Sequence, residues 1–367
     1  MKTLLHSIAV QTAWLVGVFL LLYGLAALGQ RLDAHRLGEA KLRAVLFING
    51  TLGDKSFFDA AAAGMRRARD TLPVFVKVVE GGTDPTRWQA ALNDLADSGD
   101  YDLIVTGTFT MVPYVQQLAE QYPRARFVVF DAAVDYTRCR CQNVHSILFR
   151  QNEGAYLAGY LAARLDQVGL PGVERGGGLG VVGGMQFPVI DDFIIGFKAG
   201  AQAAVPGETV LTQYANSFSD PAAGKEVAKA QFGRGVGIVF HAAGATGQGV
   251  NEAALEGHRY AIGVDMDQYA MYRASNPQLA ARIVTSVLKN VDVAVVRAIG
   301  QALQGQLAYG QSQSLGLAEH GVSLARHSDV LARAPAEVLR SLDDVQAAVE
   351  RGEQRVPSAF SPAPAKP

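Results

Sequence analysis

Two adjacent carboxylates and a histidine are the residues of this chain that could perform acid–base chemistry. Asp191 and Asp192 stand side by side, and His241 ends a short apolar run. A carboxylate pair with a histidine can act as general acid and base on a bound substrate. Neighbouring residues at the start of a helix point in different directions, however, and a histidine at a strand end is commonly structural. The pattern favours a binding protein over a hydrolytic enzyme, and we predict no catalytic residue.

Cys139, Cys141 and His145 come closest to a metal-binding pattern. They fall short of the four ligands of a zinc site, and two thiols separated by one residue either stay apart in a surface loop or form a strained local bridge. The glycine-rich run 244–249 (GATGQG) lacks the Gly-Lys-Ser/Thr ending of a phosphate-binding loop, and its glycines do not follow the dinucleotide-binding order. We therefore predict neither a metal site nor a cofactor.

Three segments place polar residues directly after short apolar runs. They are 216–225 (NSFSDPAAGK), 240–249 (FHAAGATGQG) and 263–268 (GVDMDQ). In an open α/β sheet, the loops that follow the strands carry the ligand contacts. These segments therefore predict ligand contacts at the ends of the strands.

Apolar runs of strand length alternate with segments of helical spacing along the chain. The predicted strands are 44–48, 74–79, 103–106, 127–130, 179–182, 210–214, 237–240 and 260–264. The predicted helices are 57–70, 85–97, 111–121, 153–165, 193–204, 221–233 and 248–256. This alternation indicates an α/β fold whose parallel sheets are covered on both faces. Beyond these, we expect a helix over 285–300, a short strand over 321–325 and a last helix over 335–352.

Composition bounds the size and the partners of the protein. With 367 residues the chain is too long for one compact core and suits two lobes. A formal net charge of −1 gives no field that would attract nucleic acid or an anionic membrane. We predict no nucleic-acid partner.

The N-terminus predicts export. Residues 8–29 (IAVQTAWLVGVFLLLYGLAALG) carry no charge and are long enough to cross a bilayer as a helix. A cleaved signal peptide usually has a shorter apolar region, so cleavage after Gly29 and retention as a membrane anchor both stay open. Residues 31–42 would form a stalk. We expect a periplasmic or extracytoplasmic protein, with anchoring in the inner membrane as the second option.

Five motifs in order resemble one protein family. They are 53–57 (GDKSF), 151–159 (QNEGAYLAG), 183–191 (GGMQFPVID), the three loop segments above, and 285–292 (TSVLKNVD). In this combination the chain resembles the basic membrane protein family of bacterial ABC-transporter substrate-binding proteins, whose best understood members are purine nucleoside receptors. The resemblance covers about residues 43–357. Family members are commonly lipoproteins tethered through a cysteine after the signal sequence, and this chain has no cysteine there.

The resemblance implies the roles of individual residues. Phe57 and Phe218 match the two stacking positions, one from each lobe, and Asp131 matches a polar contact to the base edge. For the ribose, Asp265 would accept from two hydroxyls and Lys289 would donate to them. The remaining ligand contacts are expected at Gly244, whose backbone can approach closely without a Cβ, and at Asn49.

One position departs from the family pattern. Where purine-binding members have an aspartate at the end of the first strand, this chain has Ile48, which cannot form a hydrogen bond, and the following Asn49 would supply an amide instead. Phe58 stands where asparagine is usual, and Phe187 is expected near the rim of the site. The ligand is therefore expected to be a purine nucleoside or another small aromatic, hydroxylated solute.

The resemblance also predicts the domain organisation and the mechanism. We expect two Rossmann-like lobes of the type I periplasmic-binding-protein kind, joined by hinge strands near Ser146, Val264 and the segment after Val291. The predicted division is 1–30 signal peptide or anchor, 31–42 stalk, 43–146 with 265–290 first lobe, 147–264 with 291–357 second lobe, and 358–367 disordered tail. The lobes would close on the ligand for recognition by ABC permease subunits. A membrane-anchored sensor with the same fold, or a nucleoside-processing enzyme, is the alternative.

Overall fold

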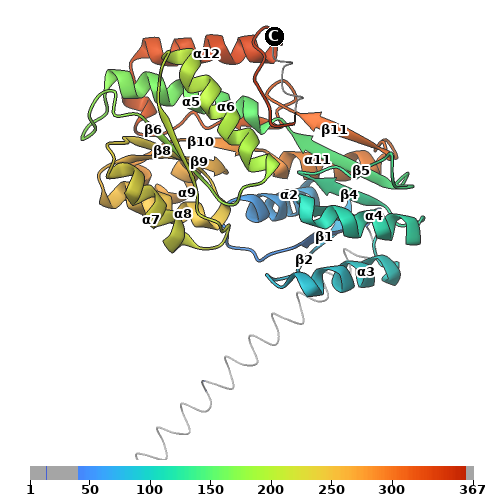
Figure 1. Ribbon diagram of the computed structural model, residues 1–367. Helices are drawn as coiled ribbons and strands as arrows, with labels where there is room; N and C mark the ends of the chain where they lie inside the picture. Colours follow the sequence, from blue (N-terminus) through green and yellow to red (C-terminus); the bar gives the residue numbers. More distant parts are fainter. Residues whose placement is uncertain (1–13, 15–39, 361–367) are drawn as a thin grey trace, which may run out of the picture.

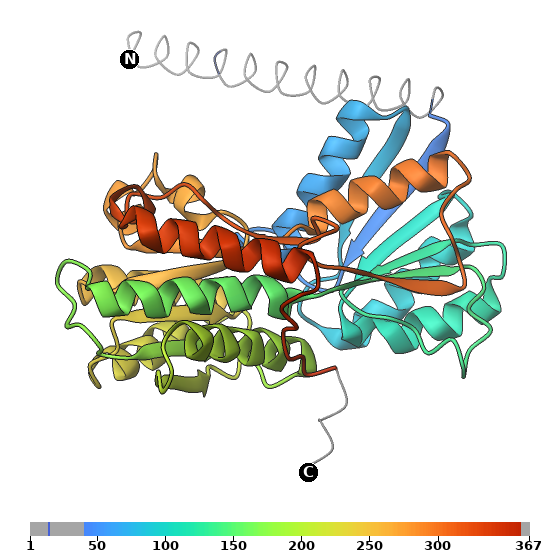
Figure 2. The same ribbon diagram turned by 90° about the horizontal axis from the view of Figure 1, so that it is seen from above.

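The computed structural model describes residues 14 and 40–360. Within these residues the strands form two six-stranded sheets, with the orders β11-β5-β4-β3-β1-β2 and β12-β10-β9-β8-β6-β7. We call the first sheet with its helices the first lobe and the second sheet with its helices the second lobe. The two lobes lie side by side (Figures 1 and 2). The predicted α/β fold with two Rossmann-like lobes is confirmed.

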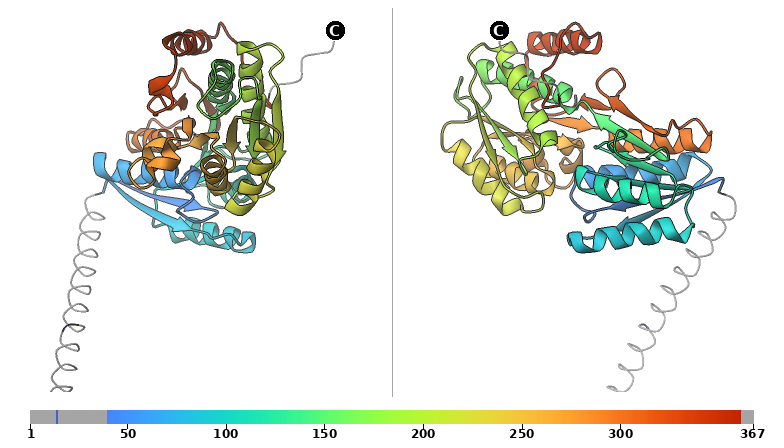
Figure 3. Two further views of the ribbon diagram at one scale, coloured as in Figure 1. Left: turned by 90° about the vertical axis from the view of Figure 1, so that its left-hand side faces the viewer. Right: turned by 45° about the vertical axis from the view of Figure 1, so that its right-hand side comes forward.

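All strand pairs of the first lobe are parallel. The strands are β1 (Leu42–Ile48), β2 (Val74–Glu80), β3 (Leu103–Gly107), β4 (Phe127–Phe130), β5 (Val144–Phe149) and β11 (Gln311–Leu315). Helices α2 (Phe57–Thr71) and α11 (Val291–Leu303) pack together on one face, and α3 (Trp88–Ser98) and α4 (Val112–Gln121) cover the other (Figure 3). The 3-10 turns η1 (Pro85–Arg87) and η2 (Phe109–Met111) precede α3 and α4.

The sequence of β1 shows why both faces of this sheet need a helical layer. Leu46 and Ile48 pack in the core formed with α2 and α11, whereas Val45 and Phe47 pack in the core formed with α3 and α4. All four side chains are buried. Because consecutive strand residues point to opposite faces, an unbroken apolar run requires cover on both sides.

The second lobe has the same layered plan, with one antiparallel edge strand. Its strands are β6 (Leu179–Gly183), β7 (Val210–Tyr214), β8 (Ile238–Ala242), β9 (Tyr260–Asp265), β10 (Ile283–Lys289) and the antiparallel β12 (Val322–Leu324). Helices α5 (Gln151–Val168), α6 (Pro188–Ala204) and α12 (Ala336–Glu350) lie on one face. The other face carries η3 (Gly244–Thr246), α7 (Pro221–Phe232), α8 (Gly247–Glu256), α9 (Gln268–Tyr272) and α10 (Pro277–Ala280), and η4 (Leu331–Arg333) precedes α12.

Glycines allow α5 and α6 to pack with their backbones in close approach. A Cβ on Gly159 would lie 2.0 Å from the carbonyl oxygen of Phe197, and one on Gly200 would lie 1.9 Å from that of Tyr156. Real Cβ atoms do not come so close to backbone, so a side chain at either position would push the helices apart. This contact fixes the helix pair behind the second sheet.

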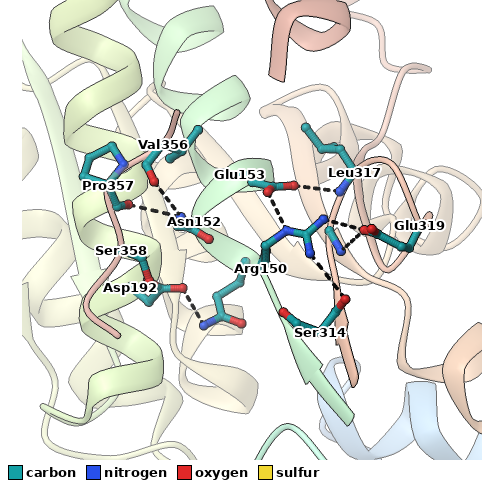
Figure 4. Close-up of polar contacts among 12 residues, drawn as sticks. Arg150, Asn152, Glu153, Asp192, Ser314, Leu317, Glu319, Val356, Pro357 and Ser358 are labelled. Carbon is teal, nitrogen blue, oxygen red and sulfur yellow. Dashed lines mark hydrogen bonds and ion pairs between the residues drawn. The ribbon is translucent and has the colours of Figure 1, made fainter. Parts of the chain in front are cut away.

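Among the described residues the chain crosses between the two sheets three times, after β5, after β10 and after β11. Figure 4 shows how the first and third crossings are tied together. The guanidinium of Arg150 donates to Glu153 (Nε to Oε1, 2.6 Å) and to Glu319, and Glu153 accepts from the backbone N–H of Leu317 at 2.8 Å. The second crossing joins this group because Asn290 donates its backbone N–H to the carbonyl oxygen of Gly321 at 2.9 Å. The crossings thus form one connected multi-strand hinge.

Several predicted boundaries need correction. The segment 265–290, predicted in the first lobe, contains β10 of the second sheet, and 291–357, predicted in the second lobe, contains α11 and β11 of the first. The predicted helix 285–300 is a strand up to Lys289 and a helix only from Val291. Val264 lies inside β9, not in a hinge segment.

The predictions for the two chain ends have different outcomes. In the tail, which we predicted to be disordered over 358–367, Ser358 and Ala359 both donate to the buried Asp192, at 2.6 and 2.8 Å. The predicted signal or anchor segment 1–30 and nearly all of the stalk lie outside the described residues. None of the helices among the described residues combines the length and the apolar character of a membrane span.

Candidate functional site

The loop after β1 positions the start of α2 through two aspartates. The carboxylate of Asp54 accepts from the backbone N–H groups of Ser56, Phe58 and Asp59 at 2.9–3.1 Å. Asp59 in turn accepts from the N–H groups of Gly53 and Lys55. Carboxylates at a helix N-terminus satisfy N–H groups that lack helical partners. The motif 53–57 is therefore a rigid turn that presents Ser56 and Phe57 to the second lobe.

Lys289 is the central charged residue between the lobes. Its Nζ lies 2.7 Å from Oδ1 of Asp131, which follows β4, and its side chain is only 2% exposed. The same Nζ stands 5.0–5.7 Å from the ring centres of Phe57, Phe149 and Phe193. Cation–π attraction adds to the ion pair at such distances. Strand ends and helix starts of both lobes thus converge on one ammonium group.

Asp265 forms a second contact between the lobes. It ends β9, is 9% exposed, and accepts a hydrogen bond from the hydroxyl of Ser56, the buried residue before α2. Burial raises the pKa of Asp265 to about 6, although Lys289 and Ser56 both favour the ionised form. Burial also raises the pKa of Asp131 above its usual value, against the opposing effect of Lys289.

The backbone is strained where these carboxylates stand. Asp131 and Asp265 have φ angles of 61° and 64°, and Thr108, Asn216 and Lys55 also have positive φ. Asp265 is the last residue of β9, and the other four lie in loops next to strands or helices. Non-glycine residues rarely take this conformation, and such strain gathers at ligand sites.

The two predicted stacking rings lie in separate aromatic groups. Phe57 packs against Phe130 with ring centres 5.4 Å apart. Phe218 lies nearly parallel to Phe187 at 6.5 Å, and Phe187 contacts Phe109 of the first lobe at 4.3 Å. The predicted rim position of Phe187 thus carries an aromatic contact between the lobes.

Gly244 lies next to the backbone carbonyl of Phe218. Gly244 has a φ of 57°, and a Cβ there would lie 3.2 Å from the carbonyl oxygen of Phe218. The same carbonyl accepts the N–H of Thr246 at 3.2 Å. A Cβ on Gly184 would lie 2.4 Å from the Phe218 ring. Gly184 makes room for the aromatic ring and Gly244 for the backbone of Phe218. The predicted direct contact of Gly244 with ligand remains a prediction.

Asn49 lies at the end of β1 and points to the loop after β3. Its Nδ2 donates to Oγ1 of Thr110 at 2.7 Å, and its Oδ1 accepts from the hydroxyl of Thr108 at 3.3 Å. Ile48, which stands where the resemblance led us to expect an aspartate, is 1% exposed and belongs to the hydrophobic core. The polar group at this strand end is therefore neutral.

The sequence of residues 41–350 matches the family model described as ABC transporter substrate-binding protein, PnrA-like. The chain belongs to this family. It is 32% identical over 249 residues to basic membrane protein A1 of Borrelia garinii subsp. bavariensis, covering 67% of this chain and 68% of the relative. It is 29% identical over 328 residues to the CD4+ T-cell-stimulating antigen of Listeria monocytogenes, covering 84% and 85%.

Solved structures agree with this assignment. A solute-binding protein of an ABC transporter system from Aeropyrum pernix K1 is 28% identical, superposes with a TM-score of 0.74, and covers 86% of this chain and 94% of its own. A solute-binding protein from Conexibacter woesei, at 23% identity, a TM-score of 0.69, and coverage of 87% and 100%, shares the fold. The protein is thus an ABC transporter substrate-binding protein with the expected two-lobed architecture.

The acid–base residues of the enzyme alternative have separate partners in this substrate-binding protein. Asp191 accepts from the hydroxyl of Tyr214, whereas Asp192 accepts from Gln151 and Ser358. His241 is fully buried, contacts Gln268 at 3.2 Å through Nε2, and burial lowers its pKa to about 4. Each side chain thus joins its own element to a different neighbouring segment, and the three share none of these partners.

The two cysteines are not free thiols. Cys139 and Cys141 form a disulfide, the locally bridged form that we left open. Within the part of the chain that the structure describes, no group of three or more His, Cys, Asp and Glu side chains is arranged to hold a metal ion.

Sequence reasoning missed several contributors to the region between the lobes, among them Phe149 and Phe193 beside Lys289. Four others contact a residue of the site or of the opposite lobe: Ser56, Thr108, Phe109 and Tyr272. Tyr272 makes its contact with Lys55 of the first lobe, whose Nζ lies 5.1 Å from the centre of the Tyr272 ring. Of these four, only Ser56 stands in a quoted motif. Thr108, Phe109 and Tyr272 carried no signal, because their partners are far away in the sequence.

Proposed function

We propose that this substrate-binding protein binds a purine nucleoside, or a similarly small aromatic and hydroxylated solute, between its two lobes. The observation that carries the proposal is the convergence of Phe57, Asp131, Asp265 and Lys289. They come from four distant segments and from both lobes, yet Lys289 contacts two of the others directly. An aromatic face, two carboxylates and one ammonium fit the faces and the hydroxyl groups of such a ligand.

The proposed division of labour follows the chemistry of each group. The rings of Phe57 and Phe218 would stack on the two faces of the base, a contact worth about 1–3 kcal/mol per ring by analogy with base stacking. The oxygens of Asp265 would accept from ribose hydroxyls, in part replacing the hydroxyl of Ser56. Lys289 has three donors, so it can bind Asp131 and the ribose together.

Closure of the lobes couples binding to delivery. Ion pairs, hydrogen bonds and aromatic contacts join the lobes at Asp131–Lys289, Ser56–Asp265 and Phe109–Phe187. A ligand that contacts both lobes favours this closed arrangement over an open one. The closed shape would then be recognised by the permease subunits of the transporter.

The site of action is proposed to be outside the cytoplasm, next to the membrane. The uncharged run 8–29 would direct export and, if retained, would anchor the protein in place of a lipid. The intact mass of protein extracted from membranes tests this. A mature N-terminus near Gln30 would contradict the anchor and leave export by a cleaved signal.

Calorimetric titration of the full-length chain in detergent tests the ligand assignment. The chain is first unfolded and refolded to remove carried ligand, then titrated with adenosine, guanosine, inosine, cytidine, uridine and the free bases. Dissociation constants in the micromolar range or below for purine nucleosides support the proposal. Absence of binding across the panel would overturn it, and the family membership would stand.

A further inference from the structure

The turn before α2 touches the second lobe at two points outside the proposed ligand site. The carbonyl oxygen of Asp54 accepts from Nε2 of Gln248 in α8 at 3.3 Å. The ammonium of the next residue, Lys55, lies 5.1 Å from the ring centre of Tyr272 in α9. None of these four residues is a proposed ligand contact. We call the pairs Asp54–Gln248 and Lys55–Tyr272 the outer contacts.

The outer contacts and the proposed site share one rigid turn. Ser56 is completely buried and donates to Asp265 in the site, whereas its neighbour Lys55 is exposed. The backbone N–H of Lys55 donates to Asp59 at 2.8 Å, and that of Ser56 donates to Asp54 at 3.0 Å. The two side chains therefore move together with the turn. The outer contacts form on its solvent side when the lobes come together.

The contact between Lys55 and Tyr272 is a cation–π interaction between the lobes. Tyr272 is half-buried, and burial together with the negative charge of Glu252 raises the pKa of its hydroxyl. The phenol is therefore neutral at physiological pH, and the ammonium is attracted to the ring and not to a phenolate. At a partly exposed position such an attraction changes an equilibrium by about two- to fivefold.

Both outer contacts depend on closure, because each joins a residue of the first lobe to a residue of the second. A contact that is present in the closed state and absent in the open state raises the fraction of closed molecules. The apparent affinity for a ligand that needs the closed state rises with that fraction. A residue of this kind changes affinity without touching the ligand.

We infer that Lys55, Tyr272 and Gln248 set the affinity for the solute from outside its site, by stabilising the closed arrangement of the lobes. This inference rests on the proposed closure around a ligand and does not depend on which solute is bound. The three are positioning residues. They slow the release of the ligand, because release requires the lobes to open and the outer contacts to break.

Distance measurement between two spin labels tests the inference without a chosen ligand. The native cysteines are bridged, so labels attach to cysteines introduced by Ala90→Cys on α3 and Ala230→Cys on α7, both exposed positions. The full-length chain is measured in detergent as purified, with any carried ligand, and again after refolding. We expect Tyr272→Leu to lower the ratio of closed to open molecules about threefold. Tyr272→Phe keeps the ring and should keep the ratio.

The kinetics of adenosine binding to the refolded chain, followed by surface plasmon resonance, give a second readout. Tyr272→Leu and Lys55→Met should each speed release about threefold and leave the association rate unchanged. The double variant should release adenosine no faster than either single variant, since both changes remove the same contact. Lys225→Met, on the surface of the second lobe, is the control and should release adenosine at the wild-type rate.

Two results would overturn the inference. One is a closed fraction and a release rate that stay at wild-type values in both Tyr272→Leu and Lys55→Met. The other is an equal loss in Tyr272→Phe and Tyr272→Leu, which would assign the effect to the hydroxyl and not to the ring. If adenosine does not bind the wild-type chain, the proposed ligand is in question, and the closed fraction of the labelled chain still decides on the outer contacts.

Discussion

The ammonium of Lys289 at the end of β10 lies 2.7 Å from the carboxylate of Asp131 after β4, so the two lobes share an ion pair that is almost closed to water. Taking both charges out of water is costly, and the attraction between them offsets this cost only while both are present. Each residue of the pair therefore stabilises the buried charge of the other, and the pair joins the two lobes. The charge of either residue alone would be buried without a partner.

Lys289→Met should destabilise the protein strongly. The methionine leaves the buried carboxylates of Asp131 and Asp265 without the ammonium, and loss of one partner of a buried pair costs about 3–5 kcal/mol. Urea unfolding followed by circular dichroism measures the free energy. The double variant Lys289→Met with Asp131→Asn should recover at least half of the loss.

Lys225→Met is the matched control for this variant. Lys225 forms ion pairs with Glu252 and Glu256 on the surface between α7 and α8, where water screens the charges. Its replacement should leave the unfolding midpoint almost unchanged. Equal midpoints for the two lysine variants would show that the ion pair between the lobes contributes no more to stability than the surface pairs of Lys225.

Phe218→Ala should weaken ligand binding by at least about tenfold without unfolding the second lobe, because one base-stacking contact is lost. Calorimetric titration measures the affinity, and the melting temperature reports on the fold. Phe360→Ala removes an exposed ring outside the region between the lobes and should leave affinity unchanged. Wild-type affinity in Phe218→Ala would remove Phe218 from the site.

Titration of Asp265 should lower the free energy of unfolding as the pH rises from about 4 to about 6. Its usual pKa of 3.8 applies in the unfolded chain, and burial raises it to about 6 in the folded chain. The folded state therefore binds the proton more tightly. The contribution is complete below the unfolded pKa and is lost above the folded one, for a total of about 3 kcal/mol.

Asp265→Asn tests this dependence, because the variant lacks the titrating group. Urea unfolding of wild type and variant at pH 4 and pH 7 gives the free-energy difference between them at each pH. We expect the variant to gain relative to wild type at pH 7. A difference that is the same at both values would show that Asp265 does not titrate in this window.

Deletion of residues 358–367 should destabilise the second lobe. Asp192 is 1% exposed and loses two donors in this variant, the hydroxyl of Ser358 and the N–H of Ala359. An unpaired buried acceptor costs about 1–3 kcal/mol. Deletion of 361–367 alone keeps both donors and serves as the control in thermal unfolding. If the two deletions have equal melting temperatures, the tail contact contributes nothing.

The layered fold was predictable because apolar runs such as β1 and β4 are buried on both faces. The error over 285–300 has a physical cause. Thr285 and Lys289 are polar, but Thr285 donates to a buried carbonyl and Lys289 to Asp131, so polar residues inside a strand imitate an amphipathic helix. β11 (Gln311–Leu315) was missed because its first four residues are exposed and polar.

Most predicted residues of the candidate site stand in a motif, whereas Asn49 and Asp131 were predictable from their place directly after a strand. Asp265 and Lys289 end strands and were recognisable by their place, whereas Phe109 is a site neighbour only through Phe187, far away in the sequence. Only part of the neutral polar group after β1 was predictable from the sequence. Asn49 could be named from the sequence, but its two threonine partners depend on the pairing of β1 with β3.

The threefold crossing of the chain has a consequence for biosynthesis. α11 and β11, which complete the first lobe, are translated after β6 to β10 of the second. While the ribosome makes the middle of the protein, α2 lacks its helical neighbour and β5 presents an unpaired edge to the surroundings. The lobe that begins first is thus unable to finish first, because its sheet lacks β11 until residue 315 has been made.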